Sequence, residues 1–242
     1  MLVGQDFEPV KFKLFGIDLI EPNALIGDTF IALVSFFLAF KTIQLIKQSN
    51  GHKAFFSYWK FFFVIFGFSF IAGGLGHSCY NFWGPPGKYF GWLASIVGVY
   101  LIEQAMLSLY SKEKSKRLFQ KLSKLKLVIA LVAEVLVFVL ADLYADPQKG
   151  LAVPSITSTV GFISCLLILG WHYQKTITDG FKWFWISVLT IVPTAVFQGM
   201  KISIHPLFDR NDMSHILLIV SLVLYWAGIS AFNKHLQSKS KS

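Results

Sequence analysis

The sequence predicts an all-α polytopic membrane protein, a bundle of seven transmembrane helices with its N-terminus outside and its C-terminus inside. Three observations lead to this prediction. The 242 residues are 55% hydrophobic and 14% charged, with a mean hydropathy of +0.59, which is far from the composition of a soluble domain. Apolar runs of about 20 residues, long enough to cross a bilayer, follow one another along the chain. Lys and Arg are distributed unequally between the links that join these runs.

The apolar runs leave no length for a separate soluble domain, so residues 1–242 are expected to form one membrane domain. The start of the chain carries Asp6, Glu8, Asp18 and Glu21 where a secretory signal peptide needs a basic and then apolar run, so the first span is expected to target the chain. The seven spans are expected at 24–46, 55–75, 90–110, 125–143, 151–171, 181–204 and 213–232.

Most links between the spans are short and rich in turn residues, as WGPPGK and YADPQKG show, which favours antiparallel neighbours. The third link, SKEKSKRLFQKLSKLK, is longer and holds seven basic residues and one acid. Its apolar side chains recur at helical spacing, which predicts an amphipathic segment in the lipid headgroup region. These side chains are Leu118, Phe119, Leu122 and Leu125.

The charge of the links predicts the orientation. Fourteen Lys and Arg fall in the first, third and fifth links and the C-terminal tail, against six on the opposite side. By the positive-inside rule the N-terminus faces out. A net charge of +9 is also typical of proteins with acidic partners, but most of the excess lies in the third link. We therefore interpret it as a topology signal and an anionic-lipid contact, and expect the lipid bilayer rather than nucleic acid as the partner.

A polar stretch, IHPLFDRNDMSH at 204–215, separates the last two apolar runs. Ionisable residues next to a membrane core are costly and mark candidate functional sites. The second span delivers His77 to the same outer level. The topology therefore brings together three histidines and two carboxylates, which are His77, His205, His215, Asp209 and Asp212.

Two interpretations of this group are compatible with the sequence. Imidazoles beside carboxylates are ordinary zinc ligands, and three of them plus water would form a hydrolytic site in which Asp212 or Asp209 acts as general base on an ester or amide. Alternatively, Asp209 caps the last helix and Asp212 lies near its positive end. In that case His205 is a loop residue and His77 is an interior histidine that bonds to a neighbouring span.

One histidine at the end of the second span and another in the seventh resemble the CREST superfamily, which includes the alkaline ceramidases and the progestin and adiponectin receptors. The resemblance implies a seven-helix zinc hydrolase of lipid amides, with His77 as the first metal ligand and His215 as the last. Asn211 stands where that pattern has another histidine and Gly73 where it has a serine, so His205 or Asp212 would have to substitute. The motifs GGLGH and NDMSH are also similar to a group of bacterial multi-pass proteins, which implies a bacterial inner membrane and no particular activity.

Two carboxylates within the spans support a different class of function. Glu103 falls inside the third span and Glu134 inside the fourth. Buried carboxylates are expensive unless they are paired or protonated, and they mark ion and proton paths in transporters. A non-enzymatic transporter or ligand-binding membrane protein is therefore the alternative to a zinc-dependent hydrolase.

Overall fold

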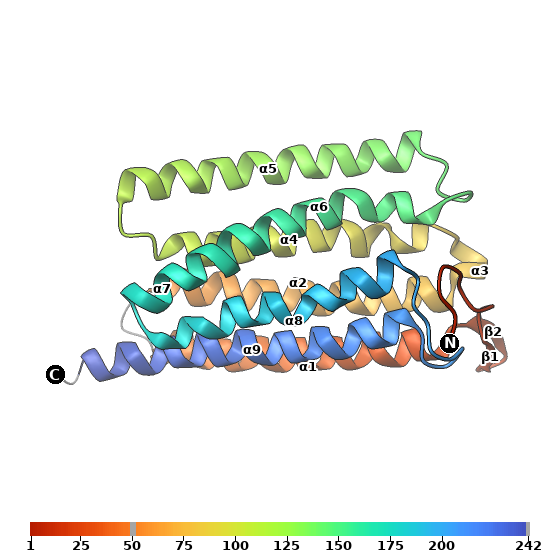
Figure 1. Ribbon diagram of the computed structural model, residues 1–242, viewed down its shortest axis with the longest axis horizontal. Coiled ribbons are helices and arrows are strands. Elements are labelled where there is room, and N and C mark those ends of the chain that lie inside the picture. The colour runs from red at the N-terminus through yellow and green to blue at the C-terminus, as the bar shows by residue number, and fades with distance from the viewer. Residues whose placement is uncertain (49–51, 241–242) are drawn as a thin grey trace.

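The computed structural model describes residues 1–48 and 52–240. Its long helices run side by side along one axis, with the N-terminus and a short β-hairpin at one end and the last turns of the final helix at the other (Figure 1). We call these the N-terminal end and the C-terminal end. In chain order the elements are β1 (Lys11–Leu14), β2 (Ile17–Ile20), α1 (Pro22–Gln48), α2 (Lys53–Ser78), α3 (Tyr80–Trp83), α4 (Pro86–Ser108), α5 (Glu113–Leu140), the 3₁₀-helix η1 (Pro147–Leu151), α6 (Ala152–Gly161), the π-helix η2 (Phe162–Leu169), α7 (Gly170–Thr176), the 3₁₀-helix η3 (Asp179–Phe181), α8 (Lys182–Gly199) and α9 (Arg210–Lys239).

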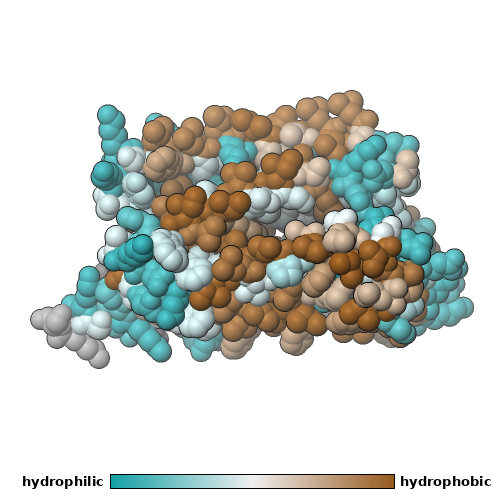
Figure 2. Space-filling view, viewed as in Figure 1, coloured by the Kyte–Doolittle hydropathy of each residue, from teal (hydrophilic) through white to brown (hydrophobic). Residues whose placement is uncertain are grey.

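Six helical stretches of the described chain are long and apolar enough to cross a membrane. Apolar side chains cover the middle of the molecule and hydrophilic ones gather at both ends (Figure 2). This distribution is that of a multi-pass membrane protein. The six stretches are Pro22–Lys47, Lys53–Ser78, Pro86–Ser108, Pro147–Thr176, Asp179–Gly199 and Arg210–Lys239.

The prediction of an all-α chain is confirmed, with the two-stranded hairpin β1–β2 as a small addition. The run expected at 125–143 lies in α5, which is not among the six stretches because its first half is strongly basic. The basic segment expected in the headgroup region is the beginning of this same helix. No Gly or Pro interrupts the chain between Lys112 and Asp146, so one helix continues through both parts. Seven spans and the orientation of the chain stay predictions.

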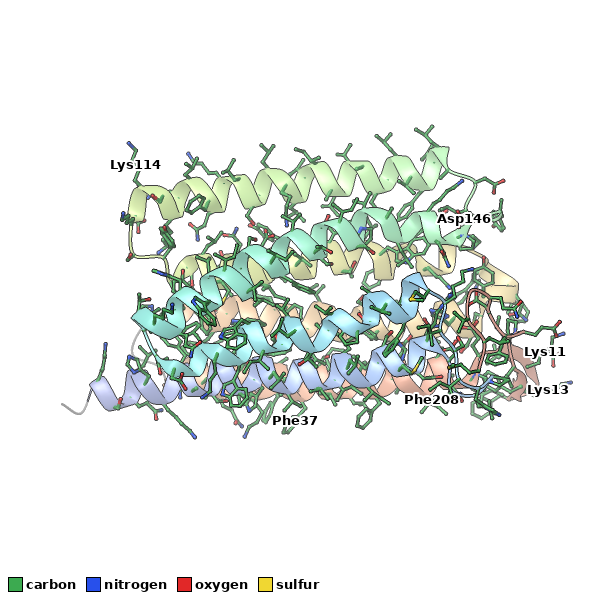
Figure 3. The ribbon with its side chains drawn as sticks, viewed as in Figure 1. Lys11, Lys13, Phe37, Lys114, Asp146 and Phe208 are labelled. Carbon is green, nitrogen blue, oxygen red and sulfur yellow. The ribbon has the colours of Figure 1, made fainter. Side chains whose placement is uncertain are left out.

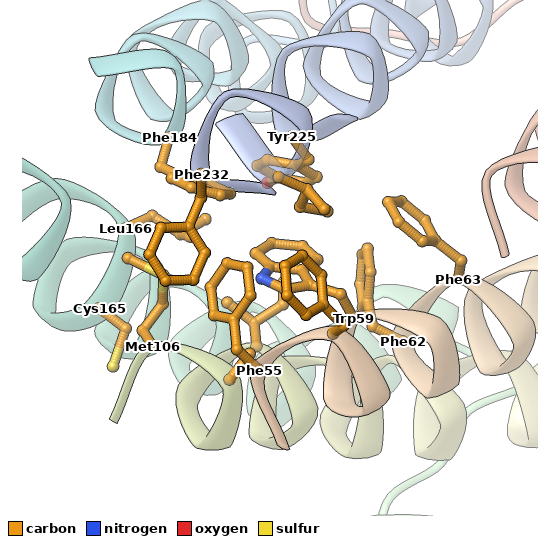
Figure 4. Close-up of a cluster of buried hydrophobic side chains, with 14 of the residues drawn as sticks. Phe55, Trp59, Phe62, Phe63, Met106, Cys165, Leu166, Phe184, Tyr225 and Phe232 are labelled. Carbon is orange, nitrogen blue, oxygen red and sulfur yellow. The ribbon is translucent and has the colours of Figure 1, made fainter. Parts of the chain in front are cut away.

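A cluster of aromatic rings joins α2, α8 and α9 in the half of the bundle nearer the C-terminal end (Figure 4). The rings of Trp59 and Phe184 stack with centroids 5.3 Å apart and 20° between their planes. Tyr225 packs against both rings, with its centroid 5.3 Å from that of Trp59 and 6.5 Å from that of Phe184. A side chain at Gly228 would meet the Phe184 ring at 2.7 Å, so the glycine is what lets this ring enter. The largest group of packed rings therefore joins these three helices.

Removing the central ring of this cluster should destabilise the fold. Trp59 is fully buried, so Trp59→Ala leaves a cavity and should lower the free energy of unfolding by about 3 kcal/mol. Thermal unfolding of the purified protein in detergent measures the effect. Trp83→Ala is the control, because this side chain is half exposed. Equal losses in the two variants would contradict the assigned core.

Candidate functional site

Three helix termini meet at the N-terminal end of the bundle. α1 and α9 begin there and α2 ends there, and Figure 3 shows Phe208, from the link before α9, and Lys11 and Lys13 of the hairpin at this same end. This arrangement brings His77 from α2 and His215 from α9 to the same end. Each imidazole contacts a carboxylate from α1 or the residue just before it.

His77 forms the first histidine–carboxylate pair. Its Nδ1 lies 2.6 Å from Oε2 of Glu21. The His77 side chain is 26% exposed and the Glu21 side chain 31%. An ionised carboxylate only accepts hydrogen bonds, so Nδ1 donates, and in the neutral ring Nε2 then carries a lone pair. No other hydrogen bond to this ring occurs among the described residues. His77 therefore has one oriented nitrogen and one free nitrogen.

The backbone at Glu21 is unusual. Its φ of 54° lies in the left-handed region, which non-glycine residues seldom occupy and which costs of the order of 1–3 kcal/mol. The Glu21 amide donates to the carbonyl of Val10 at 2.9 Å, so the hairpin holds this conformation in place. The turn directs the carboxylate toward His77 directly before α1 begins.

The charge of Glu21 is favoured by its surroundings. Burial works to raise the pKa of this carboxyl, but the hydrogen bond from His77, the electrostatic interaction with the same ring and the positive charges of Lys88 and Arg210 hold the pKa below its usual 4.5. Glu21 is therefore a carboxylate at neutral pH. His77, Lys88 and Arg210 come from α2, α4 and α9, so the charge lies where three helices converge.

Asp28 and His215 form the second pair, deeper in the bundle. Oδ1 of Asp28 lies 3.1 Å from Nε2 of His215, with side-chain exposures of 4% and 17%. Side chains at Gly73 and Gly74 would approach Asp28 within 3.2 Å and 3.0 Å. A side chain at Gly27 would come within 2.8 Å of Nδ1 of His215. The three glycines therefore make the room in which this pair lies.

The second ring also keeps one nitrogen free. Nδ1 of His215 is buried and has no hydrogen-bond partner among the described residues. Phe70 packs against this ring edge-on, with centroids 6.0 Å apart. Each imidazole thus lies against a carboxyl group and has one nitrogen without a partner. Only the His77 contact is a hydrogen bond, because Oδ1 of Asp28 has no hydrogen-bond partner among the described residues.

Neither Glu21 nor Asp28 is among the site residues that the sequence predicts. Asp28 could have been found, because a carboxylate within an apolar span is itself a functional signal. Glu21 could not, because its role depends on the hairpin that folds back at Val10. Gly73 and Gly74, which lie against Asp28, explain part of the GGLGH motif.

His205 lies apart from the two pairs. It is exposed, and its Nδ1 accepts a hydrogen bond from the amide of Leu207 at 3.1 Å. Its backbone bridges to Phe208, which closes a tight turn. No contact joins His205 to either of the other two histidines within 1–48 and 52–240. The loop interpretation of His205 agrees with this geometry.

Asp209 and Asp212 form a capping box at the start of α9. Oδ1 of Asp209 accepts from the amides of Asn211 at 2.7 Å and Asp212 at 3.2 Å. Oδ2 of Asp212 accepts from the amide of Asp209 at 2.9 Å. These bonds satisfy amides that the first turn of a helix leaves free. The capping interpretation is confirmed, and a role of either carboxylate as general base stays a prediction.

The N-terminal segment covers this end of the bundle. Asp6 lies 2.8 Å from the guanidinium of Arg210 and 3.4 Å from the ammonium of Lys201. The backbone of Leu2 exchanges two hydrogen bonds with Ser203, at 2.7 and 2.9 Å. A hollow of about 40 Å³ remains beneath the segment, and Glu21 is among its lining residues. The other lining residues are Phe7, Glu8, Pro9, Val10, Pro22, Asn23, Ala24, Pro206, Asp209, Asn211 and Asp212.

The residues fit a zinc ion only in part. A histidine that binds zinc through one ring nitrogen commonly donates a hydrogen bond from its other ring nitrogen to a carboxylate. A catalytic zinc needs three protein ligands, and the described residues contain no group of three or more His, Cys, Asp or Glu that could hold a metal. The geometry therefore supplies two oriented histidines without a third ligand, and a role for zinc stays a prediction.

Comparisons with known proteins give a family but no activity. A family model described as "Family of unknown function (DUF6962)" matches residues 24–234. No curated protein and no solved structure matches the chain. The matched region includes Asp28, His77 and His215 but not Glu21.

The Glu21–His77 pair predicts a pH dependence of stability. Because the pKa of folded Glu21 lies below 4.5, its contribution is present above that pH and is lost as pH falls through the folded value. Glu21→Gln should therefore lower the unfolding temperature at neutral pH, and the difference from the unchanged protein should shrink below about pH 4.5. Thermal unfolding across this range measures it. Glu8→Gln is the matched control, and the interpretation is wrong if that variant gives the same pH profile.

The capping box predicts which replacements of Asp209 are tolerated. Asp209→Ala removes the acceptor for two amides and should cost about 1 kcal/mol of unfolding free energy. Asp209→Ser should keep most of that stability, because serine caps helices about as well. Thermal unfolding separates the two variants. A serine variant as unstable as the alanine variant would show that capping is not the main role of this side chain.

Proposed function

The chain belongs to this family of unknown function, and we propose that it is an integral membrane hydrolase in which His77 activates water at the N-terminal end of the bundle. The single observation that carries the proposal is the 2.6 Å contact between Nδ1 of His77 and Glu21, which leaves Nε2 without a partner. A carboxylate that fixes the tautomer and orientation of an imidazole is the arrangement that general-base histidines use in hydrolases.

The chemistry assigns one step to each group. Nε2 of His77 takes a proton from water, and the hydroxide attacks a carbonyl carbon. The imidazolium that forms is stabilised by Glu21 through Nδ1. When the C–O or C–N bond breaks, the imidazolium returns its proton to the leaving oxygen or nitrogen. Lys88 and Arg210 carry positive charge close enough to act on Glu21, and they are our candidates for stabilising the negative oxygen of the intermediate.

The expected substrate is a lipid ester or amide. The site lies at a polar end of an apolar bundle, which is the level of the lipid headgroups and the carbonyl groups next to them. A substrate anchored in the membrane would reach this level without leaving the bilayer. The resemblance to lipid-amide hydrolases in span order favours the same class.

Orientation and location are part of the proposal. The fourteen basic residues on one side against six on the other favour an outward-facing site, with α5 as a seventh span. The similarity to bacterial multi-pass proteins favours a bacterial inner membrane. Non-enzymatic transport or ligand binding, with Glu103 and Glu134 as its carboxylates, is the competing function.

Hydrolysis of labelled lipids tests the proposal. Protein in lipid nanodiscs is incubated with two lipids that carry the same fluorescent acyl group, one through an ester and one through an amide. His77→Ala should lower the rate about 100-fold or more, and Glu21→Gln should lower it less. His172→Ala, at the opposite end of the bundle, should leave the rate unchanged. No hydrolysis of either lipid, or equal rates with and without His77, would contradict the proposal.

The metal content of the same preparations separates the two mechanisms. Stoichiometric zinc that is lost in both His77→Ala and His215→Ala would favour a zinc-dependent hydrolase. Full activity in protein without stoichiometric zinc would favour His77 as the base.

A further inference from the structure

A second group of buried polar residues lies between α4, α5 and α6, away from the N-terminal site. Helix α5 runs from Lys114 near the C-terminal end toward Asp146 near the N-terminal end (Figure 3). Most of its large apolar side chains are exposed, although Phe138 packs on α4, and the buried residues of this helix are Ser123, Ala130 and Glu134. The side chains that this helix buries are therefore polar or small. A helix of a soluble protein usually does the reverse and buries an apolar face.

In the half of this interface nearer the C-terminal end, the buried polar side chains form ion pairs and hydrogen bonds with one another. Glu103 of α4 is ion-paired with Lys126 of α5 and accepts a hydrogen bond of 2.5 Å from Ser123. Gln104 donates to Ser123 at 3.1 Å, and Lys126 reaches the carbonyl of Thr157 in α6 at 3.4 Å. Glu103 thus has a cation and a hydroxyl to support its negative charge.

Glu134 has no such support. Its exposure is 0%, and neither carboxyl oxygen has a hydrogen-bond partner among the described residues. The helical segments that pack against α5 are α4, α6 and η1. Their titratable residues are Lys88, Tyr89, Tyr100 and Glu103 on α4 and Lys149 on η1, while α6 has none. None of these groups forms an ion pair or hydrogen bond with Glu134 within the described chain.

Two contacts fix where Glu134 lies along α4. Lys126 pairs with Glu103, and Phe138 stacks on Tyr89 with centroids 3.9 Å apart. Because the two helices are antiparallel, this register places Glu134 level with Ala94 and Ser95. The charged pair Glu103–Lys126 is then two helical turns away, on the order of 12 Å.

We infer that Glu134 is a proton-binding site inside the bundle, which carries a proton at neutral pH and exchanges it with water along the polar face of α5. A carboxylate without a partner is very costly away from water, and a bound proton removes that cost. Ser123, Lys126 and Glu103 are the polar groups that lie on the same side of α5 nearer the C-terminal end. The ligand of this second site is the proton, and the inference does not rest on hydrolysis at the first.

Infrared spectroscopy of the full chain in nanodiscs tests the inference. The carbonyl stretching band of a protonated carboxyl group should be present at about pH 6 and should disappear reversibly by about pH 10. Because Asp28 is also buried, the spectra are recorded in an Asp28→Asn background. In that background Glu134→Gln should abolish the band, and Glu103→Gln should retain it. A band that is absent at pH 6 would show an ionised Glu134 and overturn the inference. A band that is unchanged between pH 6 and pH 10 would show that Glu134 stays protonated, and would overturn the inference that it exchanges its proton with water.

Labelling of the unaltered protein gives a readout that needs no variant. Dicyclohexylcarbodiimide reacts with protonated carboxyl groups in apolar surroundings, and mass spectrometry of the peptides locates the adduct. Glu134 should be labelled at least about tenfold more than Glu103, whose charge Lys126 stabilises. Equal labelling of both residues, or stronger labelling by a water-soluble carbodiimide, would overturn the inference.

Discussion

The pairing of Asp28 with His215 is the contact on which the polar end of the bundle depends. A carboxylate in an apolar helix needs a partner inside the protein, because neither lipid nor a dry interior can solvate it. The partner comes from α9, and the space comes from Gly73 and Gly74 of α2. This contact therefore joins α1 and α2 to the last helix of the chain. The Glu21–His77 pair is more exposed and depends on the left-handed turn before α1.

The two ends of the bundle are stabilised by different means. Near the C-terminal end, Trp59, Phe184 and Tyr225 interlock, and packing of this kind permits little displacement. At the N-terminal end ion pairs and hydrogen bonds, such as the pair of Asp6 and Arg210, add to smaller ring contacts such as that of Phe70 with His215. The end with fewer packed rings is the end that holds the two oriented histidines. A rigid scaffold that positions a more adaptable polar site is common among enzymes and binding proteins.

The sequence predicted the helices well and the site only in part. Hydropathy located the spans because each is a long apolar run with turn residues at its ends. It missed the start of α5, since basic residues hide a helix whose backbone continues without a break. The chain order of the helices indicated that His77 and His215 lie at one end. Their partners Glu21 and Asp28 depend on the left-handed turn before α1 and on the fit of Asp28 against two glycines, and local patterns do not encode such distant contacts.

The ties between Leu2 and Ser203 and between Asp6 and Arg210 also constrain how the molecule is assembled. The two residues of each pair are about two hundred positions apart. Leu2 and Asp6 therefore have no partner until the ribosome has made the helices that follow them. The segment before the hairpin can make these contacts only after the chain has been made as far as the start of α9. Until then the buried carboxylate of α1 has no imidazole beside it, and the last helix to be inserted completes the site.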